Sequence, residues 1–176
     1  MRPAELTITR TTTPKEKPDW DQLQFGRVFS DHMFVMDYEE GRGWYDARIV
    51  PFGNFEMSPA SLVFHYGQTV FEGLKAFRGK DGKIRVFRPE QNMKRMNDSN
   101  DRLSMPNFDS EFVIDAMKQL VALDADWIPP RDGMALYLRP VMFATDAFLG
   151  VAPSKTYRFI VMTSPVGAYY EGGMSP

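Results

Sequence analysis

The order of the regular elements constrains the fold of this 176-residue chain more than any other feature of its sequence. Two helical segments follow one another in the middle of the chain, and strand-like segments come both before and after them. The sequence lacks the regular alternation of strand and helix that supplies the crossovers of a parallel sheet. The order therefore predicts an α+β domain with a largely antiparallel sheet and two principal helices.

The two helices are predicted from their start signals and from the spacing of their apolar residues. Pro89 suits the first turn of a helix, because an N–H at that position has no intrahelical partner, and this helix is expected to extend to about Leu103, before Pro106. Asp109 is a suitable N-cap for a second helix that begins near Ser110. The apolar residues of the second helix recur on one face: Val113, Ala116, Met117, Leu120 and Val121.

Strands are predicted where apolar and β-branched residues stand between turn signals. The predicted strands are residues 32–38, 44–50, 71–78, 83–88, 135–143 and 157–163. The clearest turn is Gly79-Lys80-Asp81-Gly82, because an Asp-Gly pair supplies the positive φ angles of a tight hairpin. Residues 71–78 and 83–88 are therefore expected to form an antiparallel hairpin.

Composition and charge exclude several classes of function. The net charge of −2 at pH 7 argues against a nucleic-acid partner and against attraction to an anionic membrane. No apolar run approaches the roughly 20 residues that span a bilayer. With no cysteine, and with His32 and His65 as the two histidines, neither a thiolate nor a multi-histidine metal site is expected. The lack of cysteine suits a reducing cytoplasm, which is the expected location.

The chain is expected to contain one folded domain with an extension at each end. Residues 1–20 are interpreted as a polar N-terminal arm, mobile or loosely packed, without the hydrophobic segment of a signal peptide. Residues 21–170 are expected to form the domain. Residues 171–176 are glycine-rich at their start and are interpreted as the beginning of an interdomain linker whose second domain is missing.

Tyr137 and Arg139 form a candidate anion site. They stand two residues apart on a predicted strand, so both side chains project from one face. A phenol beside a guanidinium suits a carboxylate, because arginine offers planar, paired donors. The alternative is a surface arginine on an edge strand with a half-buried tyrosine, and spacing alone leaves both interpretations open.

Arg88, Arg95 and Arg102 form a second candidate, because their spacing of seven traces roughly one stripe along the first helix. Such a stripe could hold a phosphate dianion. The alternative is a solvated face in which the arginines pair with acidic residues of the same helix, such as Glu90 and Asp98.

Six motifs, from about Phe25 to Gly173, resemble in their order the N-terminal part of branched-chain amino acid aminotransferases, a family of fold-type IV pyridoxal-phosphate enzymes. The most specific is HYGQTVFEGLKAF at residues 65–77. The others are residues 25–33, residues 87–89 with 92–96, residues 136–140, residues 148–153 and residues 164–169. The resemblance implies the small domain of such an enzyme.

The resemblance also implies roles for individual residues. Arg95 matches the arginine that holds the phosphate of pyridoxal phosphate, and Arg139 matches the arginine that helps to bind a substrate carboxylate. Leu149 and Val151 match a loop that reaches into the pocket of a partner subunit. Five aromatic residues match walls of the substrate pocket: Phe29, Tyr66, Phe71, Tyr137 and Tyr169.

For the complete enzyme, the resemblance implies transfer of the amino group of leucine, isoleucine or valine to 2-oxoglutarate, with glutamate as the other amino acid. It also implies a homodimer. The Schiff-base lysine of the family lies in the large domain, beyond the equivalent of Pro176, so no residue of this chain is expected to be catalytic and the chain alone is expected to be inactive. Without the large domain, its pocket side is expected to meet water and to cause self-association.

Two other functions stay open. One is a relative within the same superfamily, a D-amino acid aminotransferase or an aminodeoxychorismate lyase. The long section before Phe25 and the loop that contains Leu149 and Val151 favour the branched-chain group instead. The other is a non-catalytic binding or assembly module.

Overall fold

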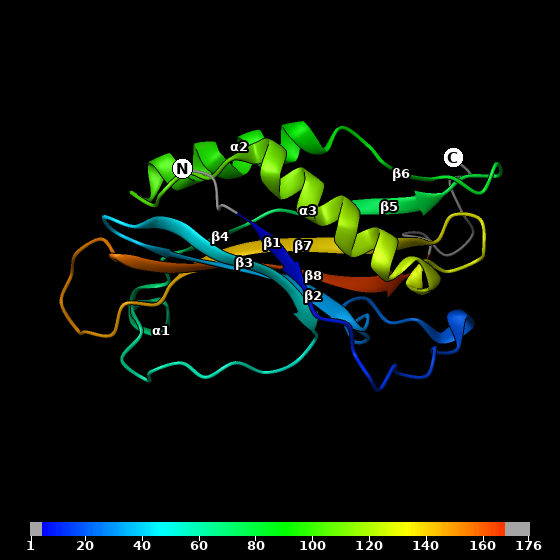
Figure 1. The fold of residues 1–176 in the computed structure, drawn as a ribbon, viewed down its shortest axis with the longest axis horizontal. Coiled ribbons are helices and arrows are strands. Elements are labelled where there is room, and N and C mark those ends of the chain that lie inside the picture. The colour runs from blue at the N-terminus through cyan, green and yellow to red at the C-terminus, as the bar shows by residue number, and fades with distance from the viewer. Residues whose placement is uncertain (1–4, 168–176) are drawn as a thin grey trace.

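One eight-stranded sheet organises the computed structural model, which describes residues 5–167 (Figure 1). The strands are β1 (Leu6–Ile8), β2 (His32–Glu39), β3 (Gly43–Pro51), β4 (Thr69–Phe71), β5 (Leu74–Arg78), β6 (Ile84–Val86), β7 (Ala135–Ala144) and β8 (Thr156–Val166). Their order across the sheet is β1-β3-β2-β8-β7-β5-β6, and β4 also pairs with β7. Every pair is antiparallel except β1 with β3. The predicted α+β fold class is confirmed.

The two principal helices lie side by side on one face of the sheet. They are α2 (Pro89–Arg102) and α3 (Ser110–Leu123), close to the predicted bounds. The Asp109 side chain caps α3 as predicted, because it accepts a hydrogen bond from the backbone N–H of Phe112. The apolar face predicted for α3 is buried against the sheet and α2. Between residues 5 and 167, no helix is long and apolar enough to cross a membrane.

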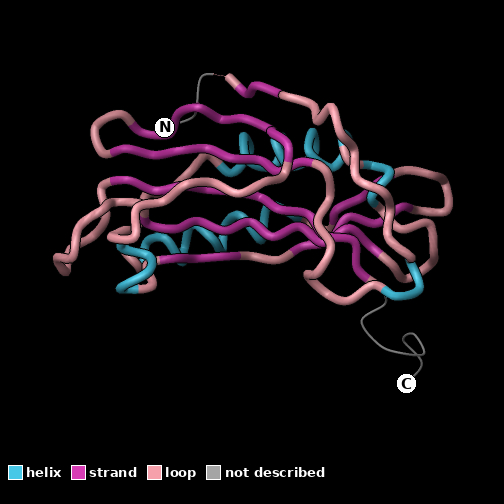
Figure 2. Tube along the Cα trace, turned by 90° about the horizontal axis from the view of Figure 1, so that it is seen from below, coloured by secondary structure: helices cyan, strands magenta, loops and turns pink. Residues whose placement is uncertain are grey.

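The opposite face of the sheet carries a smaller hydrophobic cluster. Met33, Val35, Phe143 and Ile160 form its buried part, and residues of the 52–63 segment pack against them. The short helix α1 (Leu62–Tyr66), which the sequence analysis did not predict, lies on this side (Figure 1). Seen from below, loop segments cross in front of the strands while the long helices lie behind them (Figure 2).

Strand β7 divides its side chains between these two faces. Leu136 and Leu138 are fully buried in the core beneath the helices. Tyr137 and Arg139 alternate with them and therefore project from the other face. The alternation places the candidate anion site on the face away from α2 and α3.

The predicted strand at residues 71–78 is wrong in one respect, because the structure interrupts it at Glu72 and Gly73. The reason lies in the partner strand. Pro140 of β7 has no N–H to donate to a neighbouring strand, and its carbonyl accepts the N–H of Glu72 at 3.0 Å. Strand β4 therefore pairs with β7 on one side of this break and β5 pairs with it on the other.

The expectation of a mobile or loosely packed N-terminal arm is also wrong for the described part of that arm. Strand β1 pairs with β3 in parallel register. Further along, the N–H of Thr11 donates to Nε2 of His32 at 2.9 Å, and the N–H of Lys15 donates to Oδ1 of Asp31 at 3.0 Å. These backbone groups bind specific partners in the domain, so the arm is docked over its described residues.

Candidate functional site

Arg95 reaches from α2 to the break between β4 and β5, where it meets Glu72. Its Nε donates to Oε1 of Glu72 at 2.9 Å and its Nη2 donates to Oε2 at 2.7 Å. Asn92, one helical turn earlier, donates from Nδ2 to Oε2 of Glu72 at 2.9 Å and to the carbonyl of Gly73 at 3.2 Å. The paired contacts hold the guanidinium in one plane against the carboxylate.

Glu72 is charged at neutral pH. Burial would raise the pKa of its carboxyl, but the hydrogen bonds from Arg95 and Asn92 outweigh burial and hold this pKa below its ordinary value. The alternative prediction for Arg88, Arg95 and Arg102 was pairing with acidic residues of the same helix. Arg95 instead pairs with Glu72, which lies outside α2. Arg88 follows that alternative, with its Nε 3.8 Å from Oε1 of Glu90.

The donor chemistry of Arg95 fits a phosphate. A guanidinium carries five N–H donors, and Glu72 accepts hydrogen bonds from two of its nitrogens. The Arg95 side chain is 58% exposed, so its other N–H groups are accessible to an anion. Glu72 fixes the direction in which these donors point.

Tyr137 and Arg139 contact one another directly on β7. Both Nε and Nη2 of Arg139 donate to the phenol oxygen of Tyr137, at 3.0 and 2.9 Å. The guanidinium carbon of Arg139 lies 4.5 Å from the centre of the Phe71 ring. Because β7 pairs with β8 on one side and with β4 and β5 on the other, the edge-strand interpretation of Arg139 is wrong.

A cavity of about 160 Å³ adjoins this pair. The ring of Phe25 packs edge-on against Tyr137 with the ring centres 5.0 Å apart, and Phe29 stacks on Phe52 at 4.7 Å. The cavity is lined by Phe25, Gly26, Phe29, Tyr137, Arg139, Met162, Thr163 and Ser164. It therefore combines aromatic and thioether surface with a guanidinium and hydroxyl groups.

Glu72 and Gly73 connect the two candidate anion sites across the break in the sheet. Glu72 binds Arg95 on the helix side, and the next residue, Gly73, touches Tyr137. A Cβ atom at Gly73 would collide with the Tyr137 hydroxyl oxygen, so a larger residue here would displace the Tyr137 ring. Although Arg95 and Tyr137 belong to opposite faces of the sheet, one dipeptide contacts both.

The remaining predicted site residues lie elsewhere. The Tyr66 hydroxyl donates to the carbonyl of Leu149 at 2.6 Å, and Leu149 and Val151 are 65% and 88% exposed. Tyr66 and Val151 line a separate cavity of about 310 Å³. Among the described residues, this cavity and the one beside Arg139 share no lining residue. Tyr169 lies outside the described residues.

The structure thus brings one group of predicted residues together and not the other. Phe71, Tyr137 and Arg139 adjoin each other, and Phe29 lines the cavity beside Tyr137 and Arg139. Arg95 lies on the other face of the sheet and contacts Glu72, the residue before the glycine that abuts Tyr137. Phe25, Glu72, Gly73 and Ser164 were not predicted individually as site residues. For Glu72 and Gly73 the available signal was a carboxylate next to a glycine within an otherwise apolar strand pattern.

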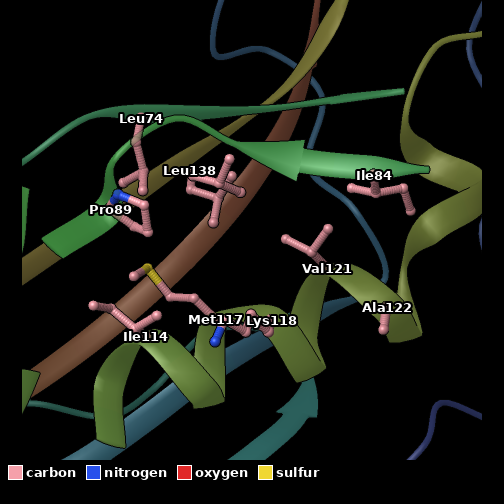
Figure 3. A pocket seen from close by; sticks show the side chains of 10 residues that line it. Leu74, Ile84, Pro89, Ile114, Met117, Lys118, Val121, Ala122 and Leu138 are labelled. Atoms are coloured by element: carbon pink, nitrogen blue, oxygen red, sulfur yellow. The ribbon is translucent and has the colours of Figure 1, made fainter. Parts of the chain in front are cut away.

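Another cavity, of about 340 Å³, lies between α3 and the β5–β6 hairpin (Figure 3). Its lining is apolar apart from Lys118. The lining residues are Leu74, Ile84, Val86, Pro89, Ile114, Met117, Lys118, Val121, Ala122 and Leu138. None of the predicted site residues between residues 5 and 167 lines this cavity.

His32 lies beside Asp124 in a buried pair that resembles an acid–base dyad. Its Nδ1 is 2.6 Å from Oδ1 of Asp124, and its Nε2 accepts the N–H of Thr11. Both ring nitrogens are therefore engaged within the fold, which supports the prediction of a structural histidine. Within residues 5–167, no group of histidine and acidic side chains is arranged to hold a metal ion.

Comparison with models of protein families finds no match. Among curated proteins, branched-chain-amino-acid aminotransferase 2 of Bacillus subtilis (strain 168) is 54% identical over 176 residues, covering 100% of this chain and 48% of that protein. A probable branched-chain-amino-acid aminotransferase of Staphylococcus aureus (strain N315) is 48% identical over 167 residues, covering 95% and 46%. The chain spans about half the length of the curated relatives it matches.

Solved structures share the fold. The branched-chain amino acid aminotransferase of Escherichia coli matches with a TM-score of 0.61 and 22% identity, over 79% of this chain and 41% of that one. The branched-chain aminotransferase of the thermophilic archaeon Thermoproteus uzoniensis, solved with norvaline, matches with a TM-score of 0.60 and 22% identity, over 80% and 43%.

Proposed function

Because the chain belongs to the branched-chain amino acid aminotransferase family, we propose that it supplies the cofactor-phosphate anchor and the substrate-carboxylate receptor of such an enzyme. The complete enzyme would transfer the amino group of leucine, isoleucine or valine to 2-oxoglutarate. The observation that carries the proposal is the contact of adjacent residues, Glu72 and Gly73, with both Arg95 and Tyr137.

Pyridoxal phosphate, when bound, supplies the carbonyl chemistry that exchanges an amino group between an amino acid and an oxo acid. The contribution of Arg95 is to hold the phosphate with the N–H donors that Glu72 leaves available. Glu72 keeps the guanidinium in one orientation, so less freedom is lost when an anion binds. In this proposal no lysine of the chain takes part in the reaction.

The cavity beside Arg139 suits a substrate that is either aliphatic or acidic. Phe25, Phe29 and Met162 offer apolar surface to an aliphatic side chain. Arg139 and Tyr137 offer donors to a second carboxylate, which glutamate and 2-oxoglutarate carry and leucine lacks. Since the phenol oxygen of Tyr137 already accepts from Arg139, its own hydrogen is available to a ligand.

The proposal is tested in a complete enzyme made by joining residues 1–176 to the unmatched half of the Bacillus subtilis relative. We expect this enzyme to form glutamate from 2-oxoglutarate with leucine as donor, and to use D-alanine poorly. Arg95→Ala should weaken the binding of pyridoxal phosphate by about tenfold or more, as expected for loss of a charged hydrogen bond. Cofactor binding is measured directly by fluorescence titration.

Lys94→Ala serves as the matched control, because Lys94 is an exposed cation of the same helix that pairs with Asp98. Its cofactor affinity should equal that of the parent enzyme. Equal cofactor affinity of the Arg95→Ala and Lys94→Ala enzymes would contradict the phosphate-anchor role. Incorporation of cofactor into the 176-residue chain alone, by borohydride reduction onto one of its lysines, would contradict the assignment of no lysine to the reaction.

A further inference from the structure

Ser164 has a buried hydroxyl group that has no hydrogen-bond partner among residues 5–167. The residue lies in β8 and is 3% exposed, and its Oγ forms no hydrogen bond with any part of the chain that the structure describes. Ser164 lines the cavity that Tyr137 and Arg139 also line. The cross-strand register pairs Ser164 directly with Tyr137, so the two side chains project from the same face of the sheet.

The adjacent residue, Thr163, also lines this cavity, but its hydroxyl has a partner within the fold. Thr163 is also buried, and its Oγ1 forms a hydrogen bond with Oγ of Ser30. A buried polar group without a partner is unfavourable, and native proteins rarely leave one unless a ligand or an ordered water satisfies it. The Ser164 hydroxyl therefore keeps an unused hydrogen-bond donor at the wall of the cavity.

The groups around the cavity determine the chemistry of that molecule. Tyr137 accepts two hydrogen bonds from Arg139 and has its own O–H to donate, and Ser164 has a second free O–H. Arg139 adds a positive charge. No carboxylate is among the described residues that line the cavity. The cavity therefore offers several hydrogen-bond donors and a positive charge. A ligand that suits it accepts hydrogen bonds and carries a negative charge, as a carboxylate does.

We propose that Ser164 is a third donor to the second carboxylate of the dicarboxylate substrate, together with Tyr137 and Arg139, and thereby favours that substrate over an aliphatic one. This inference rests on the proposed function. An aliphatic substrate has no group for the Ser164 hydroxyl to bind. Loss of the hydroxyl therefore affects one half of the reaction and leaves the other half unchanged.

The test is Ser164→Ala in the joined enzyme described above, with steady-state kinetics for each substrate. We expect KM for 2-oxoglutarate to rise about tenfold, the effect of losing one hydrogen bond to a charged group. KM for leucine and the affinity for pyridoxal phosphate should stay within a factor of two. Ser164→Thr keeps the hydroxyl and should restore much of the affinity for 2-oxoglutarate.

Thr156→Val is the control, because it removes a hydroxyl from the same strand that pairs with Thr145, away from the cavity. It should leave both KM values unchanged. An unchanged KM for 2-oxoglutarate in Ser164→Ala, or an equal rise in both KM values, would overturn the proposal, because the hydroxyl would then bind water or stabilise the strand.

A second measurement separates failure of this inference from failure of the proposed function. Glutarate and isovalerate are titrated into the 176-residue chain and its Ser164→Ala variant, and binding is followed by NMR. Weaker binding of glutarate alone in the variant supports the carboxylate subsite even if the joined enzyme has no transaminase activity. Equal binding of glutarate to both chains overturns the subsite whatever the activity.

Discussion

At the scale of single residues, Glu72 determines how the charge of Arg95 is used. Its carboxylate is mostly buried, whereas the guanidinium it binds is largely in water. A buried carboxylate needs its hydrogen bonds, since burial by itself opposes ionisation. The ion pair with Arg95 therefore contributes more to stability than an ion pair between two fully exposed side chains.

This asymmetry predicts a pH-dependent effect of Glu72→Gln on stability. Folding lowers the pKa of Glu72 from its ordinary value of 4.5. The Glu72–Arg95 ion pair therefore stabilises the fold fully above pH 4.5, and this stabilisation is lost as the pH falls through the pKa of the folded state. Glu72→Gln should reduce the free energy of unfolding by about 0.5–1 kcal/mol at pH 7, a small value because solvent screens Arg95. The difference should shrink progressively below pH 4.5, as measured by urea unfolding.

Glu40→Gln provides the comparison, because Glu40 lies outside the helices and faces Lys155 at 3.7 Å with both side chains exposed. It should unfold at the same urea concentration as the parent at either pH. A Glu72→Gln difference that persists undiminished at low pH would show that the amide disturbs packing and that the charge of Glu72 is unimportant.

The sequence could predict those parts of the site that depend only on residues close together in the chain. Tyr137 and Arg139 share a face because residues two apart in a strand always do. Ser164 was not predictable in the same way. Its position opposite Tyr137 depends on the register between β7 and β8, and its missing partner depends on which groups surround it.

At the scale of elements, α3 depends on its cap and its buried face. The Asp109 side chain satisfies the N–H of Phe112, one of the first N–H groups of the helix that have no intrahelical acceptor. Asp109→Ala should reduce the free energy of unfolding by about 1 kcal/mol. Urea unfolding of the 176-residue chain measures this loss.

Asp115→Ala removes an acidic residue from the exposed side of the same helix, where it pairs with Lys118 three residues later. This control should change stability by less than about 0.5 kcal/mol. Equal losses in the two variants would mean that helix charge, and not the cap, explains the effect of Asp109.

The elements that the sequence predicted are those with local signals. Pro89, Asp109 and the turn at residues 79–82 mark boundaries through their own backbone chemistry, and the structure confirms all three. The break at Glu72 and Gly73 has its cause in Pro140, which is distant in the sequence. Strand β1 has only three residues and needs β3 as a partner, so no local pattern predicts it.

At the scale of the whole molecule, three of the aromatic residues expected in one pocket line two different cavities: Phe29 and Tyr137 line one, and Tyr66 lines the other. Tyr66 lies with Leu149 and Val151, whereas Tyr137 lies with Arg139. The sequence motifs predict which residues belong to a site, but they do not predict which of those residues lie next to one another. Within one copy of residues 5–167, the two sets do not share a cavity.

The exposure of Leu149 and Val151 predicts that the chain self-associates through the loop that carries them. Two apolar side chains this exposed, two residues apart in one loop, favour association, because contact with another surface removes both from water, whereas Phe87 is a single exposed side chain. A mass that rises with protein concentration is expected in sedimentation velocity.

Leu149→Ser with Val151→Ser should shift the chain toward monomer, whereas Phe87→Ser, at an exposed phenylalanine just after β6, should not. A monomer at every concentration would contradict the prediction. Equal dissociation by both changes would show that general surface hydrophobicity, and not this loop, causes the association.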